Sequence, residues 1–153
     1  MSNLDDLYRE IILDHYRSPR NRGELEAPPA IRAEGFNPLC GDEIVVYLDV
    51  EGDVLKNIKM TGTGCSISQS SASLMSAAVK GKSLEQVRAI IATFKELMTV
   101  HESTLAHDDE PPKVDLRALG ELAALQGVVK FPVRIKCATL SWNTLIQGLD
   151  EVA

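Results

Sequence analysis

Residues 44–60 read IVVYLDVEGDVLKNIKM, and this stretch decides the class of fold. Residues 44–50 are mostly β-branched or aromatic, and residues 54–60 alternate between apolar and polar side chains, which is typical of strands that bury one face. Between them, Glu51-Gly52-Asp53 has the composition of a tight turn. The stretch therefore predicts an antiparallel hairpin that packs one face against the rest of the chain.

Upstream of the hairpin, a short motif places reactive side chains next to the first strand. Residues 37–42 read NPLCGD, in which a single glycine separates Cys40 from Asp42. Residues 30–35 predict a short edge strand that would complete a small antiparallel sheet. Further upstream, apolar residues at helical spacing predict a helix over residues 4–17, which the run SPRNRG at residues 18–23 ends.

Downstream of the hairpin, residues 62–68 read GTGCSIS, and Cys65 falls where a helix begins. Ser83 is a favourable N-cap for a second helix. Residues 100–113 are rich in His, Asp and Pro and predict an exposed acidic loop. The predicted helices cover residues 65–81, 83–98, 116–125 and 135–149. The pattern indicates a single α+β domain over residues 1–153, with a small antiparallel sheet of about three strands packed against a group of helices.

The composition is that of one folded domain, with 153 residues, 44% of them apolar and 25% charged. A net charge of -6 argues against non-specific nucleic-acid binding, which needs a basic surface. No apolar run approaches the roughly 20 residues needed to span a bilayer, and the acidic N-terminus is unlike a signal peptide. We therefore expect a cytoplasmic protein, and in a reducing compartment spaced cysteines more often bind metal or react than form disulfides.

The cysteines of the chain are Cys40, Cys65 and Cys137, and Asp42 adds a carboxylate to these three thiols. Zinc accepts both sulfur and oxygen ligands and prefers four of them in a tetrahedron. A cysteine at a helix N-terminus, as predicted for Cys65, also has its thiolate stabilised by the helix dipole. The alternative is that these cysteines are small buried apolar residues, because their spacing is not that of a zinc finger. The residues alone leave both interpretations open.

Three motifs together carry a resemblance to a known family: NPLCGD, GTGCSISQSSAS at residues 62–73, and RIKCATLSW at residues 134–142. The N-terminal run LYREIILDHYRSPRNRG at residues 7–23 matches as well. The chain resembles the SufU-type iron–sulfur assembly proteins, within the wider IscU/NifU-like fold family. The resemblance covers most of the chain and implies an IscU-like fold.

The resemblance also implies a set of site residues and an activity. It implies that Cys40, Asp42, Cys65 and Cys137 bind Zn2+. It implies that Cys40 accepts persulfide sulfur from a SufS-like pyridoxal-phosphate cysteine desulfurase. Arg134 matches an arginine of the SufU motif, where it either positions the persulfide or a partner carboxylate, or forms a simple ion pair. The expected function is that of a zinc-dependent sulfurtransferase, which passes sulfur to a downstream iron–sulfur scaffold complex.

Two other functions compete with this one. The same four residues suit a scaffold on which a two-iron, two-sulfur cluster is assembled, and they also suit a structural zinc domain that regulates a desulfurase by binding it. Lys136 stands where the scaffolds of the family have histidine, and residues 99–130 resemble an insertion that distinguishes SufU-type proteins. Both features favour the sulfurtransferase. We expect His15 to be a packing or surface residue, and His101 and His107 to be solvated, rather than metal ligands.

Overall fold

The predicted hairpin is the centre of the sheet. In the computed structural model, which describes residues 3–27, 29–38, 41–107, 120–130 and 132–151, strands β2 (Asp42–Glu51) and β3 (Val54–Thr63) pair antiparallel. Gly52 makes the turn with a positive φ of 63°, a conformation that glycine adopts without a steric cost. Alternate residues of the two strands, including Val46, Leu48 and Ile58, are completely buried. The hairpin prediction, including its turn, is confirmed.

Strand β1 (Ile31–Asn37) pairs antiparallel with the other side of β2, so the sheet order among the described strands is β1-β2-β3. The edge strand predicted over residues 30–35 is thereby confirmed and runs slightly further, until Asn37 pairs with Asp42. A Cβ at Gly35 would overlap Thr144 Oγ1 and lie 3.2 Å from Leu140 Cδ1. The absence of a side chain at Gly35 therefore allows the C-terminal helix to lie close against the sheet.

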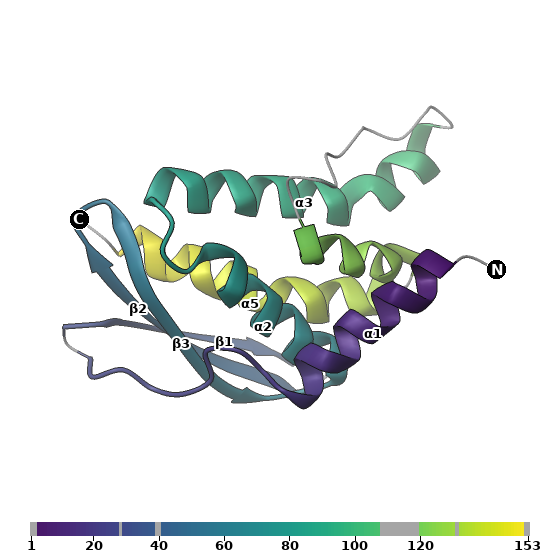
Figure 1. Cartoon of the computed structure of the whole chain (residues 1–153). Helices are drawn as coiled ribbons and strands as arrows, with labels where there is room; N and C mark the ends of the chain where they lie inside the picture. Colours follow the sequence, from purple (N-terminus) through teal and green to yellow (C-terminus); the bar gives the residue numbers. More distant parts are fainter. Residues whose placement is uncertain (1–2, 28, 39–40, 108–119, 131, 152–153) are drawn as a thin grey trace.

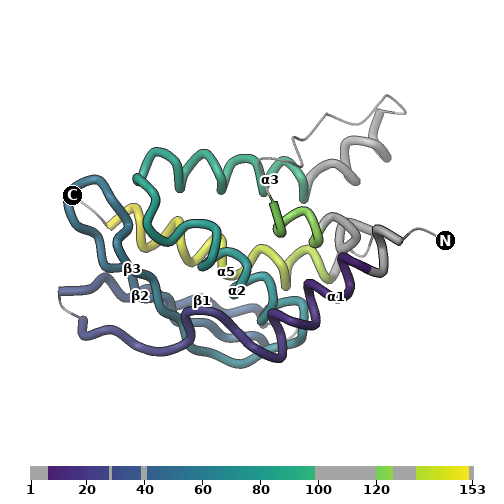
Figure 2. The backbone as a smooth tube through the Cα atoms, viewed as in Figure 1, coloured from purple at the N-terminus to yellow at the C-terminus, as the bar shows by residue number. Residues whose placement is uncertain are grey.

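The helices lie together on one side of the sheet (Figure 1). They are α1 (Asn3–Arg17), α2 (Ser66–Val79), α3 (Leu84–His107), the 3₁₀ segment η1 (Gly120–Lys130) and α5 (Pro132–Asp150). Helix α5 contacts β1 and β2, and helix α2 contacts both α5 and β3. Figure 2 shows the chain path through these layers, with the C-terminal helix enclosed between the sheet and α3.

The core lies between the buried face of the sheet and helices α2, α3 and α5. Trp142 of α5 is completely buried and stacks on Phe94 of α3, with ring centroids 4.1 Å apart. Offset and stacked aromatic pairs contribute about 0.5–1.5 kcal/mol beyond the burial of their area. Other large side chains that are fully buried include Leu48, Leu55, Ile58, Met75, Leu125 and Leu145. The architecture confirms the predicted α+β class.

Two helix predictions need correction. The second helix was expected to end near residue 98 and to be followed by a loop over residues 100–113, but α3 continues to His107. Residues 99–107 contain neither glycine nor proline, so nothing in their covalent structure stops a helix; the remainder of the predicted loop lies outside the described residues.

The segment predicted as an α-helix over residues 116–125 is described from Gly120 onward, where it forms the 3₁₀ segment η1 instead. Four consecutive residues, 122–125, are buried, and η1 contacts α1, α2, α3 and α5. Burial of these four residues against the neighbouring helices can override intrinsic helix propensity and favour this conformation. The helices predicted over residues 4–17, 65–81 and 135–149 are confirmed with ends shifted by a few residues.

Ser83 confirms its predicted N-cap position before α3. Its Oγ accepts the backbone N–H of Gln86 at 3.2 Å, and the Gln86 side chain accepts the N–H of Ser83 at 3.0 Å. This reciprocal pair is a capping box. Along the described part of the chain, the structure contains no helix with the length and apolar character that membrane crossing requires.

Candidate metal centre

Asp42 is the first residue of β2 and is completely buried. Its Oδ1 accepts a hydrogen bond from the backbone N–H of Cys65 at 3.0 Å. Its Oδ2 is buried and has no hydrogen-bond partner among the described residues. A buried carboxylate oxygen without a hydrogen-bond partner is energetically costly unless a cation faces it. The missing partner of Oδ2 is therefore the first indication of a cation site.

Cys65 is the N-cap residue of α2, as the sequence predicts. Its backbone is extended, with φ -71° and ψ 171°, and its Sγ accepts the N–H of Ser68 at 3.4 Å. The N-terminus of α2 thus donates two amides to the site, one to the sulfur of Cys65 and one to the carboxylate of Asp42. Both contacts favour negative charge at these ligands, in the direction of the helix dipole.

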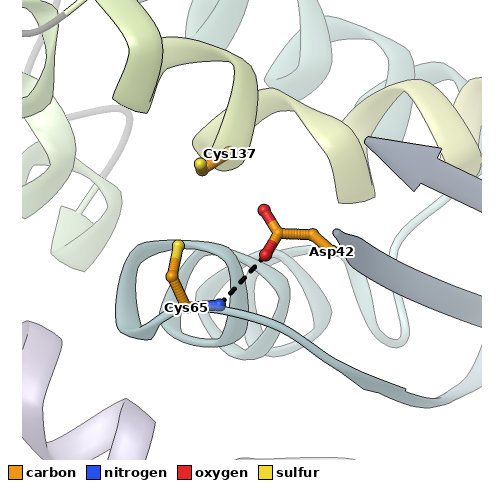
Figure 3. Close-up of side chains that lie close together, drawn as sticks. All are labelled: Asp42, Cys65 and Cys137. Carbon is orange, nitrogen blue, oxygen red and sulfur yellow. Dashed lines mark hydrogen bonds between the residues drawn. The ribbon is translucent and has the colours of Figure 1, made fainter. Parts of the chain in front are cut away.

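Cys137 completes a group that comes from three separate elements. It lies near the start of α5 and is completely buried. One ligand atom each from Asp42, Cys65 and Cys137 lies within 4.8 Å of the other two. Figure 3 shows the three side chains facing one another between β2, α2 and α5. The predicted convergence is therefore observed for these three residues, whereas Cys40 lies outside the residues that the structure describes.

The donor set fits a thiolate-binding metal such as zinc. Two sulfurs and one carboxylate oxygen are ligands that zinc accepts, and a fourth ligand would complete a tetrahedron. Gly64 provides the necessary space, because a Cβ there would lie 2.6 Å from Asp42 Oδ1 and 3.1 Å from Ser68 Oγ. The chain before Cys65 can thus pass close to the carboxylate, which holds Asp42 against the start of α2.

Arg22 supports the loop before Cys65, a role that no local sequence pattern indicates. Its guanidinium donates to the backbone carbonyl of Gly62 at 3.0 Å and to Oε1 of Gln69 at 3.2 Å. Gly62 itself has φ 146°, and a Cβ there would overlap the carbonyl of Glu43. In the sequence, Arg22 belongs to a run interpreted only as the end of the first helix. Its proximity to Gly62 arises from the fold and has no local signal.

The other candidate residues are distributed as follows. Arg134 and Lys136 are exposed on α5, before Cys137. His15 is only 2% exposed and its Nδ1 is hydrogen-bonded to Ser73 Oγ at 2.7 Å, so it is a packing residue, as expected. The side chains of His101 and His107 lie outside those that the structure describes.

Fold and site together define a class: a small α+β protein that gathers cysteine and aspartate side chains at one end of a β-hairpin. The family model for the NifU-like N-terminal domain matches residues 7–138. Relatives with curated names also match almost the whole chain. A zinc-dependent sulfurtransferase SufU from Bacillus subtilis is 45% identical over 150 residues, which cover 98% of this chain and 94% of the relative.

An iron–sulfur cluster assembly scaffold protein IscU from Streptococcus pyogenes is 36% identical over 153 residues, which cover 100% of this chain and 89% of the relative. Among solved structures, a putative iron–sulfur cluster assembly scaffold protein for the SUF system from Fervidobacterium islandicum has a TM-score of 0.76 and 29% identity, covering 92% of this chain and 94% of that one. The chain belongs to the NifU-like N-terminal domain family.

Proposed function

We propose that this chain is a zinc-dependent sulfurtransferase that accepts persulfide sulfur from a pyridoxal-phosphate cysteine desulfurase and passes it to an iron–sulfur scaffold. The observation that carries the proposal is the gathering of Asp42, Cys65 and Cys137 within 4.8 Å. The similarity to a relative named as a zinc-dependent sulfurtransferase supports the same function.

In this proposal the metal ligands are Cys40, Asp42, Cys65 and Cys137. Bound zinc keeps coordinated cysteines as thiolates at neutral pH. Asp42 contributes Oδ2, the oxygen that has no hydrogen-bond partner among the described residues, while its Oδ1 remains bonded to the Cys65 amide. A hydrogen bond from a backbone amide to a metal-binding carboxylate orients that carboxylate and is typical of metal sites.

Cys40 is the proposed sulfur acceptor. Its thiolate attacks the outer sulfur of a persulfide on the desulfurase, so that a bond forms between Cys40 Sγ and that sulfur. The bond between the two sulfurs of the donor persulfide breaks, and the desulfurase cysteine leaves as a thiolate. One S–S bond forms as another breaks, and one sulfur atom moves from one cysteine to the other. The transfer therefore needs no external oxidant or reductant.

The choice of Cys40 rests on the exposure of its sequence neighbours and on the burial of Cys137. Two of its sequence neighbours are exposed: Pro38, two residues before it, and Gly41, the residue after it. Gly41 has a positive φ of 71°. Cys137, in contrast, is completely buried, and Cys65 is fixed as the N-cap of α2. A nucleophile that must meet a cysteine on another protein has to be reachable. This requirement argues against the buried Cys137 and leaves Cys40, whose described sequence neighbours are exposed, as the proposed acceptor.

A scaffold function remains the second candidate, because several relatives carry that name. An iron–sulfur cluster needs the same thiolates. Anaerobic incubation of the purified chain with iron and sulfide separates the two: a sulfurtransferase should give no stable, transferable chromophore, whereas a scaffold should give both. The exposed Lys136 before Cys137 stands where the family resemblance implies a histidine in scaffolds, which favours the sulfurtransferase.

The deciding experiment combines metal analysis with desulfurase stimulation. Freshly purified chain should contain about one zinc per molecule and should increase cysteine turnover by the desulfurase. Cys40→Ser should abolish the stimulation, and mass spectrometry of the wild type after turnover should find one added sulfur on Cys40. Equal stimulation by wild type and Cys40→Ser would reject Cys40 as the acceptor, and a chain purified without metal would reject the zinc site.

A further inference from the structure

Ser71 forms a buried connection between helices α2 and α5. Its Oγ–H donates to the backbone carbonyl of Ala138 at 2.5 Å, and its Oγ accepts the indole Nε1–H of Trp142 at 3.1 Å. Ser71, Ala138 and Trp142 are all completely buried. A hydroxyl has one proton to donate and lone pairs to accept, so the two bonds are compatible and each gives Ser71 a partner on α5.

The connection lies beside the candidate metal ligands. Ser71 is in the second turn of the helix that Cys65 caps, and Ala138 directly follows Cys137. Ala138 and Trp142 are one helical turn apart, so both partners of Ser71 lie on the same face of α5. The stacking of Trp142 on Phe94 holds the indole from the other side.

Such a connection affects the distance between Cys65 and Cys137. The two cysteines lie on different helices, which α3 and η1 separate in the chain, so no local backbone geometry sets their spacing. A thiolate site for zinc requires its sulfurs at about 2.3 Å from the ion. Small changes in the packing of α2 against α5 would therefore change the distance between the two sulfurs and move them away from the positions that zinc requires.

We propose that Ser71 is a positioning residue for the metal centre, with Trp142 as its second partner. The inference rests on the proposed metal site and adds to it a residue that is not itself a ligand. Ser71 couples the helix that begins at Cys65 to the backbone next to Cys137. Removal of the Ser71 hydroxyl keeps all the proposed ligands, but the distance between the sulfurs of Cys65 and Cys137 is then less strictly fixed.

The test compares Ser71→Ala with Ser76→Ala. Ser76 is the same residue type on the same helix and is also completely buried. The hydrogen-bond partners of its hydroxyl are Ser73 O, Arg20 O and Asn21 Nδ2, none of which belongs to α5. Both variants should lower the thermal midpoint of the metal-free protein by a similar amount. Only Ser71→Ala should weaken zinc binding, by about tenfold or more in competition with a chelator.

Cobalt substitution supplies a readout that general destabilisation does not change. Wild type and Ser76→Ala should give the same cobalt–thiolate charge-transfer and ligand-field bands, and Ser71→Ala should shift or weaken them. If Ser71→Ala does not fold, Trp142→Phe removes one of the two bonds while keeping an aromatic ring beside Phe94, and it should shift the bands in the same direction.

The outcomes separate the two proposals. If the wild type binds zinc and loses it on Cys65→Ala, the metal site stands; equal zinc affinity and equal cobalt spectra in the wild type and both serine variants would then overturn the role of Ser71 alone. Equal losses in Ser71→Ala and Ser76→Ala would overturn it too, because both would reflect stability only. A wild-type chain that binds neither ion would overturn both proposals.

Discussion

The backbone N–H of Cys65 donates a hydrogen bond to Oδ1 of Asp42 over 3.0 Å, which joins two candidate metal ligands from different elements of the fold. The bond occupies one carboxylate oxygen and leaves the buried Oδ2 without a hydrogen-bond partner among the described residues. A buried ionised carboxylate in this position is unfavourable until a cation faces it. If Asp42 is a metal ligand, as proposed, metal binding would supply the missing partner of this oxygen.

Asp42→Asn should have opposite effects on the metal-free and the metal-bound protein. Asparagine keeps an oxygen that accepts the Cys65 amide but removes the buried charge. In excess chelator, the free energy of unfolding should stay unchanged or rise by about 1 kcal/mol. Zinc release to a chelator should become faster by about tenfold or more, because one charged ligand is lost. Denaturant unfolding measures the first effect and chelator competition the second.

Asp49→Asn is the matched control, because Asp49 is a partly buried aspartate of the same strand and is outside the candidate ligand group. It should leave zinc release unchanged, and its effect on the free energy of unfolding should come only from its place at the strand irregularity and its attraction to Lys56. The opposite pattern, in which Asp42→Asn destabilises the metal-free chain but leaves zinc release as it was, would reduce Asp42 to a structural acceptor for the Cys65 amide.

Gly64→Ala should damage the metal site through contact rather than backbone strain. The new Cβ would lie 2.6 Å from Asp42 Oδ1 and 3.0 Å from its Cγ, so the carboxylate must move away from the Cys65 amide. We expect a loss of about 1–3 kcal/mol in unfolding free energy, as for other overpacked sites, together with weaker zinc retention. Thermal unfolding and metal content after dialysis against chelator measure the two effects.

Gly52→Ala is the control for Gly64→Ala, because it introduces backbone strain without a steric clash at the metal site. Gly52 has φ 63° and open space around its Cβ direction, so alanine there costs about 1–2 kcal/mol of backbone energy without touching the ligands. Its zinc retention should equal that of the wild type. Retention that is equally impaired in both glycine variants would mean that metal binding follows overall stability and that the space at Gly64 has no special role.

The parts of the fold that the sequence predicts well are those with a local signal. The alternation of residues 54–60 identifies β3, and the turn residues Glu51-Gly52-Asp53 identify the hairpin. Cys65 follows Gly64 and precedes serines, a context that places it at the start of α2. The convergence of Asp42 with Cys65 and Cys137 was predicted from ligand chemistry and from the family resemblance, because spacing alone left it open.

The parts that the sequence does not predict depend on long-range packing. Nothing local in residues 66–73 indicates which serine bonds to α5, and Ser71 is identified only by its contacts with Ala138 and Trp142. Arg22 reaches Gly62 for the same reason, through the path of the folded chain. The polar composition of residues 100–107 suggested a loop, although the end of a helix depends on a stop signal rather than on polarity.

His15 should make the stability of the metal-free chain depend on pH. Burial lowers the pKa of His15 below its ordinary value of 6.5, with a smaller contribution from Arg20, and the carboxylate of Glu121, 3.4 Å from Nε2, partly opposes this. Asp14, next to it in the sequence, opposes it as well. Because the folded state binds the proton less readily than the unfolded state, stability is fully present above about pH 6.5 and falls as the pH drops through the lower folded pKa.

Urea unfolding at several pH values in excess chelator tests this, with His15→Asn as the comparison. An asparagine side chain reaches the position of Nδ1 and can keep a hydrogen bond to Ser73 Oγ, but it does not titrate. The difference between the two unfolding free energies should be constant above about pH 6.5 and should shrink below it. A difference that is the same at all pH values would show that His15 does not carry the dependence.

Arg134 should affect sulfur transfer without affecting metal binding or stability. It is exposed on α5 before Cys137, and no hydrogen bond or ion pair fixes it among the described side chains. Arg134→Ala should therefore change the unfolding free energy by no more than about 0.5 kcal/mol and leave the zinc content unchanged.

The effect of Arg134→Ala should be confined to desulfurase stimulation. An exposed guanidinium can donate two hydrogen bonds to a persulfide or a partner carboxylate, which a lysine ammonium does less well. Cysteine turnover by the desulfurase, measured against the concentration of this protein, distinguishes the two roles of Arg134. A lower maximal turnover indicates that Arg134 acts on the persulfide. A higher half-saturating concentration indicates that it acts in docking. Arg134→Lys should recover docking more than turnover, since it keeps the charge but not the planar guanidinium group.

Lys136→Ala is the control for loss of an exposed charge on the same helix. An equal effect of both alanine variants would show that Arg134 acts only through its positive charge.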